Sequence, residues 1–327
     1  MDAGAHVHGR HDFRLPFPVR ALWPASAAYG RGMNPMTTYA NLSTQTDIVL
    51  PPLLSDLLAS GKTVYGPDWA ATWRQRCLQD PPLFMSWQDF EWIDAEASRE
   101  IIEGWLHPGA QNGRSFLPFA QSGAGDAWCL TPLDTHGVGV ALVLHDDEAS
   151  SVSHACFDDF VCAGFLQAFA DLSDQLDDFS QPEALQLLRA DVAQAARFMT
   201  QELGDYLQDF CRRPLEIRPW RDGPRARVRQ VASLISQDEL AVELGRLPAV
   251  DLSFPVVARW EVRSVEEGGA RHGLAPEPAK IDWRTLAADP LQKMAAIRAC
   301  QSEHGCSLGQ AKAMVDQYIG GSVNAQA

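Results

Sequence analysis

The sequence predicts an α+β fold in which a mostly antiparallel central sheet is packed by helices. Three apolar runs bounded by glycine and aspartate turns are typical of neighbouring strands, and they lie at 116–119, 128–130 and 138–144. Apolar residues then recur every three and four positions from Phe157 to Leu172, which indicates a helix with one buried face. A mainly helical extension and a small C-terminal αα-hairpin complete the expected architecture.

The length and composition are those of a globular protein with room for more than one domain. The chain has 327 residues, of which 46% are hydrophobic and 21% charged, so it can bury a sizeable core. The expected divisions are a flexible arm over 1–35, an α+β domain over 36–180, an extension packed on it over 181–262, a linker over 263–282, a helical hairpin over 283–320 and a tail over 321–327.

Charge is distributed unevenly along the chain. Lys and Arg number 27 against 42 Asp and Glu, and the formal net charge is −15. This argues against a nucleic-acid or anionic-membrane binder, because each phosphate contact needs a cation. The 74 residues between Arg114 and Arg189 contain no Lys or Arg and twelve carboxylates. Because this window also holds the predicted strands, we expect a folded acidic face on which a basic partner can dock.

Cysteine usage and hydropathy indicate a cytoplasmic protein. The seven cysteines are an odd number without a CxxC pair, which suits a reducing compartment. No stretch has the length of a membrane span, and the N-terminus has no continuous apolar run of signal-peptide length. We therefore expect no membrane partner and, without a recognisable cofactor loop, no cofactor.

The segments before the predicted strands favour helices. Two prolines near the start of 48–58 suit the first turn of a helix whose leucines share one face, and Gly61 ends it. Aromatic residues from 69 to 105 have spacings that predict mostly helical structure. Within that region a helix is expected to begin at Asp94, where acidic residues meet the positive end of the helix dipole.

After the strands, the pattern predicts further helices and a basic stretch. Asp158 and Asp159 lie off the apolar stripe of their helix, on the solvent side, and are available to a partner. Residues 182–211 are predicted to form one long helix and 252–262 a closing strand. Seven arginines fall within 212–229. We expect them to be neutralised within the chain or solvated, in preference to binding RNA or phosphate.

The residues that suggest chemistry do not form a recognised catalytic pattern. A glycine-rich segment ending in Asp126 lacks the Lys-Ser/Thr of a phosphate loop, so it indicates a tight turn that exposes this carboxylate. Asp126, His145 and Asp147 are the best acid–base candidates, but no nucleophile elbow, HExxH or Walker pattern accompanies them. Clusters of His and Cys at 154–162 and 300–306 lack the paired spacing of a metal site, so no metal is expected.

The segment 116–130 resembles the core motif of the SUKH superfamily. It runs Phe-Leu-Pro-Phe-Ala-Gln-Ser-Gly-Ala-Gly-Asp-Ala-Trp-Cys-Leu, which is similar to that family's aromatic-x-Pro-Phe-Ala strand, Gly-rich turn ending in Gly-Asp, and aromatic strand. Leu-Pro-Pro at 50–52 is similar to the family's opening. Residues 140–145, the acidic, Ser-rich segment that follows them, and the Phe-Asp-Asp-Phe at 157–160 are similar to its closing strand, loop and helix. The resemblance covers roughly residues 45 to 175.

The resemblance implies a non-enzymatic α+β protein. Many bacterial members resemble immunity proteins, which bind and neutralise a toxin delivered by a contact-dependent or type VI secretion system. The expected partner is thus a cognate protein toxin with a basic active-site surface, steered by the acidic field and anchored by an aromatic side chain. The expected partner-binding residues are Asp126, Trp128, Asp134, Asp146, Asp147, Glu148, Asp158 and Asp159.

The tail over 293–316 is similar to the helical hairpin in the C-terminal domain of the bacterial ribosomal stalk protein, which recruits factors. Gly, Leu, Ala-Lys and Val-Asp have matching spacing, while Gly309-Gln310 replaces the usual charged pair. The preceding segment 266–278 has the glycine and proline content of a linker. This leaves open a second function, a non-enzymatic adaptor that recruits partners through the hairpin.

Overall fold

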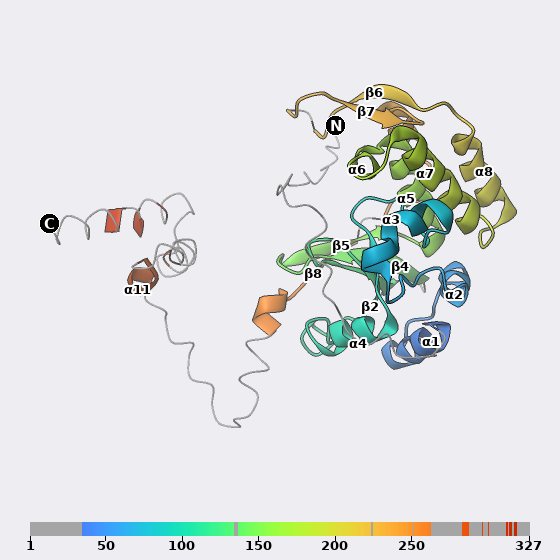
Figure 1. The fold of residues 1–327 in the computed structure, drawn as a ribbon. Helices are drawn as coiled ribbons and strands as arrows, with labels where there is room; N and C mark the ends of the chain where they lie inside the picture. The colour runs from blue at the N-terminus through green and yellow to red at the C-terminus, as the bar shows by residue number, and fades with distance from the viewer. Residues whose placement is uncertain are drawn as a thin grey trace, which may run out of the picture. The chain divides into compact units, whose positions relative to one another are not determined.

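A six-stranded antiparallel sheet with the order β1-β2-β3-β4-β5-β8 lies at the centre of the computed structural model (Figure 1). The structure describes residues 35–133, 137–223, 225–250, 252–262 and 283–287, and a few positions between 296 and 318. The chain divides into two compact units, Met1–Gly268 and Gly269–Ala327. Helices pack on the sheet of the first unit. The predicted α+β class is confirmed.

The sheet contains the three predicted central strands, the predicted closing strand and two further strands, β1 and β5. Its members are β1 (Glu91–Trp92), β2 (Leu117–Gln121), β3 (Ala127–Leu133), β4 (Gly137–Val143), β5 (Ala149–His154) and β8 (Ser253–Pro255). The acidic, Ser-rich segment after β4 was expected to be a loop, but most of it forms β5, which pairs with β4 and β8. The closing strand predicted over 252–262 is shorter than expected, because residues 259–262 are helical.

The helices of this unit agree with the sequence prediction at the Asp94 cap and differ from it in two places, α1 and the break between α7 and α8. They are α1 (Pro35–Thr46), α2 (Pro52–Ala59), α3 (Trp69–Gln79), α4 (Ala95–Glu103), α5 (Phe157–Ala170), α6 (Ser173–Leu176), α7 (Gln181–Ala195), α8 (Gln201–Cys211) and α9 (Gln237–Leu244). Asp94 caps α4 as expected, accepting from the backbone N–H of Ala97 at 2.8 Å. Helix α1, which was not predicted, precedes α2. The long helix predicted over 182–211 is two helices, because Thr200 caps a new one.

Both faces of the sheet are buried. On one face, aromatic and aliphatic residues of β2 to β4 pack with α5, whose phenylalanines 157, 165 and 169 are fully buried. On the other face, Cys129 and Val143 pack with Trp105, Leu106 and Phe254. Since both faces are covered, side chains that are free to meet a partner lie at the ends of the strands and on the outer helices.

The second unit is described only in part. Helix α11 (Trp283–Ala287) forms a small buried cluster with Ala296, Cys300 and Val315. Residues 1–34 of the arm expected over 1–35, most of the linker, most of the hairpin and the tail lie outside the described residues. In the part of the chain that the structure describes, no helix is long and apolar enough to cross a membrane. The six cysteines found there form no disulfide.

Candidate interaction site at one end of the sheet

Two of the acidic segments meet at one end of the sheet. Ala127 at the start of β3 pairs with Val143 at the end of β4. The turn before β3 and the turn after β4 therefore lie side by side. The first carries Asp126, and the second carries Asp146, Asp147 and Glu148.

Asp126 connects the two turns and is not free to meet a partner. Its Oδ1 lies 2.7 Å from His145 Nδ1 and accepts the backbone N–H of His145 at 3.1 Å. Its Oδ2 lies 3.1 Å from Ser122 Oγ. Only 13% of the Asp126 side chain is exposed. The prediction that the glycine-rich turn exposes this carboxylate is wrong, because its hydrogen bonds turn it toward the neighbouring strand end.

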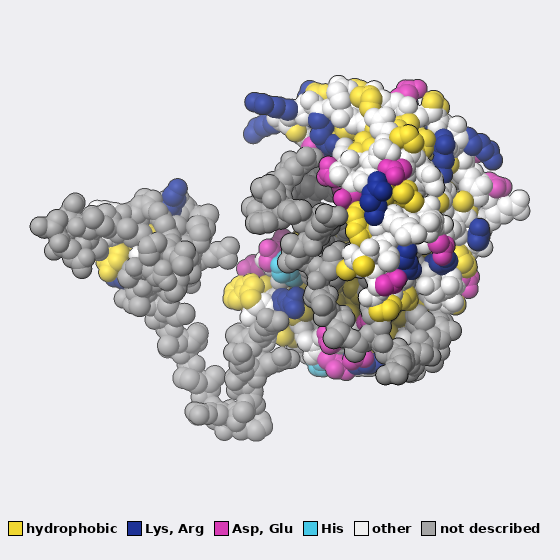
Figure 2. Space-filling model, viewed as in Figure 1, with side chains coloured by type: hydrophobic (Ala, Val, Ile, Leu, Met, Phe, Trp, Pro, Cys, Tyr) yellow, Lys and Arg dark blue, Asp and Glu magenta, His cyan; other side chains and the backbone are white. Residues whose placement is uncertain are grey.

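The turn 146–148 is exposed and is joined to the segment after β8. The Val256 N–H donates to the carbonyl of Glu148 at 2.9 Å, and the Arg259 N–H donates to the carbonyl of His145 at 2.8 Å. The next residue, Trp260, is 63% exposed. Figure 2 shows acidic, basic, histidine and hydrophobic side chains together at the left edge of this unit, where the left ends of β5 and β8 lie in Figure 1. The backbone segment that carries the exposed Trp260 is therefore hydrogen-bonded to the two ends of the turn that carries the exposed carboxylates.

Sequence reasoning did not identify Trp260 as a surface residue. The apolar run 252–262 was interpreted as a strand, in which an indole is usually core. The helical turn that begins at Arg259 exposes the indole instead. The available signal was the pair of charged residues, Arg259 and Glu261, that flank Trp260 directly after the apolar run.

The other predicted binding residues lie elsewhere. Trp128 packs against α5, with its ring centroid 5.0 Å from that of Phe160, so it belongs mainly to the core. Asp158 and Asp159 are half-buried in the first turn of α5. The turn 146–148 precedes β5 and α5 follows it, so the two acidic segments lie at opposite ends of β5. Burial, together with the charge of Asp159, raises the pKa of Asp158. Asp134 lies outside the described residues.

The arginine-rich stretch forms a hairpin whose charges are largely paired within the chain. Strands β6 (Glu216–Trp220) and β7 (Arg229–Ser233) make a separate two-stranded sheet. Four of the seven arginines form ion pairs, namely Arg212 with Asp209, Arg213 with Glu239, Arg218 with Glu216, and Arg229 with Asp171 and Asp222. Most of this basic stretch thus serves the fold.

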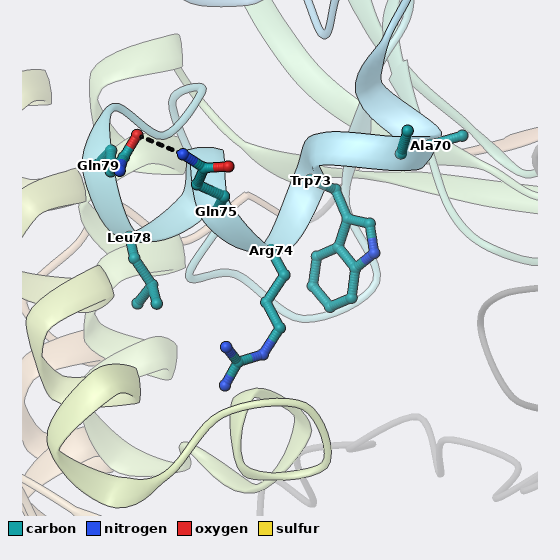
Figure 3. A pocket seen from close by; sticks show the side chains of 7 residues that line it. Ala70, Trp73, Arg74, Gln75, Leu78 and Gln79 are labelled. Carbon is teal, nitrogen blue, oxygen red and sulfur yellow. Dashed lines mark hydrogen bonds between the residues drawn. The ribbon is translucent and has the colours of Figure 1, made fainter.

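Two hollows on the described surface contain none of the acid–base candidates. The hollow in Figure 3 is lined by one side of α3, including Trp73 and Arg74. Arg74 is engaged there, since it donates to Glu183 at 3.1 Å and its guanidinium lies 5.4 Å from the Phe179 ring centroid. The second hollow lies between α7 and α8. Neither contains Asp126, His145 or Asp147.

One set of side chains in the described part of the chain has the proximity of metal ligands. Asp126, His145 and Asp146 each offer one ligand atom, and these atoms lie within 4.8 Å of one another. The His and Cys residues at 154–162 do not come together in this way. For the cluster at 300–306, His304 and Cys306 lie outside the described residues.

Comparison of the chain with protein-family models, with curated proteins and with solved structures returned no match. A function must therefore be argued from the residues themselves, and from the resemblance that they carry.

Proposed function

We propose that this protein is an immunity protein of the SUKH type that binds and neutralises a cognate bacterial toxin, an effector of contact-dependent or type VI secretion. The observation that carries the proposal is the exposed Trp260 on a segment whose backbone is hydrogen-bonded to the turn with the three exposed carboxylates at 146–148. A desolvated aromatic side chain within a charged rim is the arrangement that gives protein interfaces both affinity and partner choice. The motif at 116–130, resembling that of SUKH proteins, supports the same function.

The charge of the turn favours a basic partner. No Lys or Arg among the described residues pairs with Asp146, Asp147 or Glu148. Their field therefore extends into solvent, and such fields speed association by roughly 10- to 1,000-fold when the partner is oppositely charged. The surface of a toxin that binds phosphate groups, as in a nuclease, has the required charge. The basic rim of a phospholipase or deaminase would also fit.

Co-expression with the products of neighbouring toxin genes tests the proposal. The chain should relieve the toxicity of one of them and co-purify with it. Trp260→Ala should weaken that complex by about 2 kcal/mol or more, since interface tryptophans are frequent hot spots. Replacing the three acids at 146–148 with Asn and Gln should weaken protection. The matched control replaces three exposed acids on other surfaces with Asn or Gln, namely Asp56, Glu202 and Asp205. Protection lost equally in this control would argue against the turn 146–148 as the contact.

A second candidate is the adaptor. It is favoured by the compact unit Gly269–Ala327, which has its own buried cluster around Trp283. An adaptor that uses this unit should capture its partner as the full chain and lose it when the chain is cut after Gly268. A toxin-binding immunity protein that uses the turn 146–148 should keep its partner after the same truncation. A cytoplasmic location is part of both proposals, and it suits the cysteines of the described residues, which form no disulfide.

A further inference from the structure

We infer that Asp126, His145 and Asp146 form a binding site for a divalent transition-metal ion such as Zn²⁺, a property that goes beyond toxin binding and does not depend on it. The three side chains offer one imidazole nitrogen and two carboxylate oxygens within 4.8 Å of one another. Imidazole and carboxylate are common ligands of zinc, which is often held by three protein groups with water completing the coordination.

The fold holds the first ligand in place. The Oδ2 of Asp126 lies 3.1 Å from the hydroxyl of Ser122, which is itself 2% exposed and accepts the backbone N–H groups of Ala124 and Asp126 at 3.2 and 3.1 Å. This arrangement resembles the outer shell of a metal site, in which hydrogen bonds fix the orientation of a ligating carboxylate. Little conformational freedom at Asp126 remains to be lost when an ion binds.

Hydrogen bonds to both the N–H and the carbonyl of its backbone hold the second ligand, His145, in place. The N–H of His145 donates to Asp126 at 3.1 Å, and its carbonyl accepts from the Arg259 N–H at 2.8 Å. The imidazole Nδ1 then lies 2.7 Å from Asp126 Oδ1. An ion binding between these two atoms would replace the hydrogen that now joins them. Asp146 follows directly in the chain, on the exposed side of the turn.

The charge of the site suits a divalent ion. Two carboxylates balance the charge of M²⁺, and the neighbouring Asp147 and Glu148 add to the attraction. The nitrogen ligand favours Zn²⁺ over Mg²⁺ and Ca²⁺, which prefer oxygen ligands alone. Because the site is partly exposed, water can fill the remaining positions.

Isothermal titration of the untagged full chain with ZnCl₂ tests the site. The background variant should carry His6, His8 and His11 changed to Ala, because imidazoles in that segment also bind zinc. In this background we expect one saturable site. His145→Gln and Asp146→Asn should each weaken it by roughly 10- to 100-fold, and MgCl₂ should bind far more weakly. Asp147→Asn removes the same charge one residue away without removing a ligand, so it should weaken binding much less than Asp146→Asn does.

Two results would overturn the inference. The first is the absence of saturable zinc binding in the background variant. The second is equal weakening by Asp146→Asn and Asp147→Asn, which would mean that the turn attracts cations only through its net charge. A thermal melt provides an independent measure, since zinc should raise the melting temperature of the background variant and not that of Asp146→Asn. Loss of toxin protection without loss of zinc binding, or the reverse, would separate this site from the proposed function.

Discussion

Asp191 is a buried carboxylate whose replacement by Asn should destabilise the protein, and more strongly in acid than at neutral pH. It lies on α7 with no exposed surface. Its Oδ1 accepts the Phe84 N–H at 2.7 Å, and its Oδ2 accepts the N–H and hydroxyl of Ser86 at 2.9 and 2.8 Å. Through these bonds one carboxylate fixes the turn that carries Phe84 and Trp87, whose rings stack at 4.0 Å in the core.

The cost at neutral pH follows from the number of acceptors. Asn retains one carbonyl oxygen, so its amide NH₂ must face a backbone N–H or the serine hydroxyl. An unpaired buried donor costs about 1–3 kcal/mol. The variant also removes a desolvated charge, which offsets part of this cost. We therefore expect Asp191→Asn to lower the free energy of unfolding by about 2 kcal/mol at pH 7.5.

The pH dependence follows from the titration of the carboxyl group. Burial, the largest cause, raises the pKa of Asp191 to about 6 from its ordinary 3.8. The folded state thus binds this proton more tightly than the unfolded state does. The resulting stability is fully present below pH 3.8 and is lost as the pH rises through about 6. Acidification from pH 7.5 to 4.5 should therefore give the natural chain about 2 kcal/mol that the Asn variant cannot gain.

Urea unfolding followed by tryptophan fluorescence at pH 7.5 and 4.5 measures the difference. The destabilisation by Asp191→Asn should grow from about 2 to about 4 kcal/mol on acidification. Asp177→Asn, an exposed position at the end of α6, serves as the control and should cost little at either pH. A destabilisation that is equal at both pH values, or smaller in acid, would refute the assignment of a raised pKa to this carboxyl group.

Two further changes probe the core and the surface. Gly164→Ala would place a Cβ 2.5 Å from the ring of Trp87 and should cost about 1–3 kcal/mol despite the better helix propensity of Ala. Gly223→Ala, which meets no atom within 4 Å, should be nearly neutral in the same urea experiment. Replacing the three acids at 146–148 with Asn and Gln should slow association with the toxin and flatten its salt dependence in stopped-flow measurements, while a thermal melt stays level or rises slightly. An unchanged rate at low and high salt would mean that the turn is not the contact.

The central hairpins were predictable because their information is local. Strands β2, β3 and β4 carry apolar runs separated by turn residues, and each pairs with its neighbour in the chain. Strand β5 was missed because its sequence, Ala-Ser-Ser-Val-Ser-His, has only one large apolar residue, Val152. Its strand structure depends on β4 and on β8, which lies about a hundred residues later in the sequence. No pattern within the segment could report that pairing.

The break between α7 and α8 shows the limit of periodicity. Apolar residues continue at helical spacing across 196–200, so the pattern predicted one helix. The structure ends α7 at Ala195 and begins α8 after Thr200, whose side chain accepts the Leu203 N–H at 3.3 Å. A threonine followed by a glutamate is a start signal that the apolar spacing obscured.

The candidate site was predictable in composition and not in geometry. An acidic window can be counted from the sequence, but whether a carboxylate faces solvent depends on partners such as His145, which is 19 residues from Asp126 and meets it only through the register of β3 and β4. The hydrogen bonds of Asp126 therefore remove it from the docking surface. Trp260 joins that surface through backbone contacts that no local pattern encodes.

The acidic turn 146–148 and the pair Asp158 and Asp159 should act as separate electrostatic surfaces. Strand β5 runs between the turn 146–148 and the first turn of α5, and its six residues span about 20 Å. That separation is roughly twice the Debye length at physiological salt, so neutralising one group leaves the field of the other almost intact. If the toxin docks at the turn and Trp260, Asp158→Asn with Asp159→Asn should leave both the association rate and its salt dependence unchanged. A slower rate in that double variant, with no effect at 146–148, would instead place the contact on the first turn of α5.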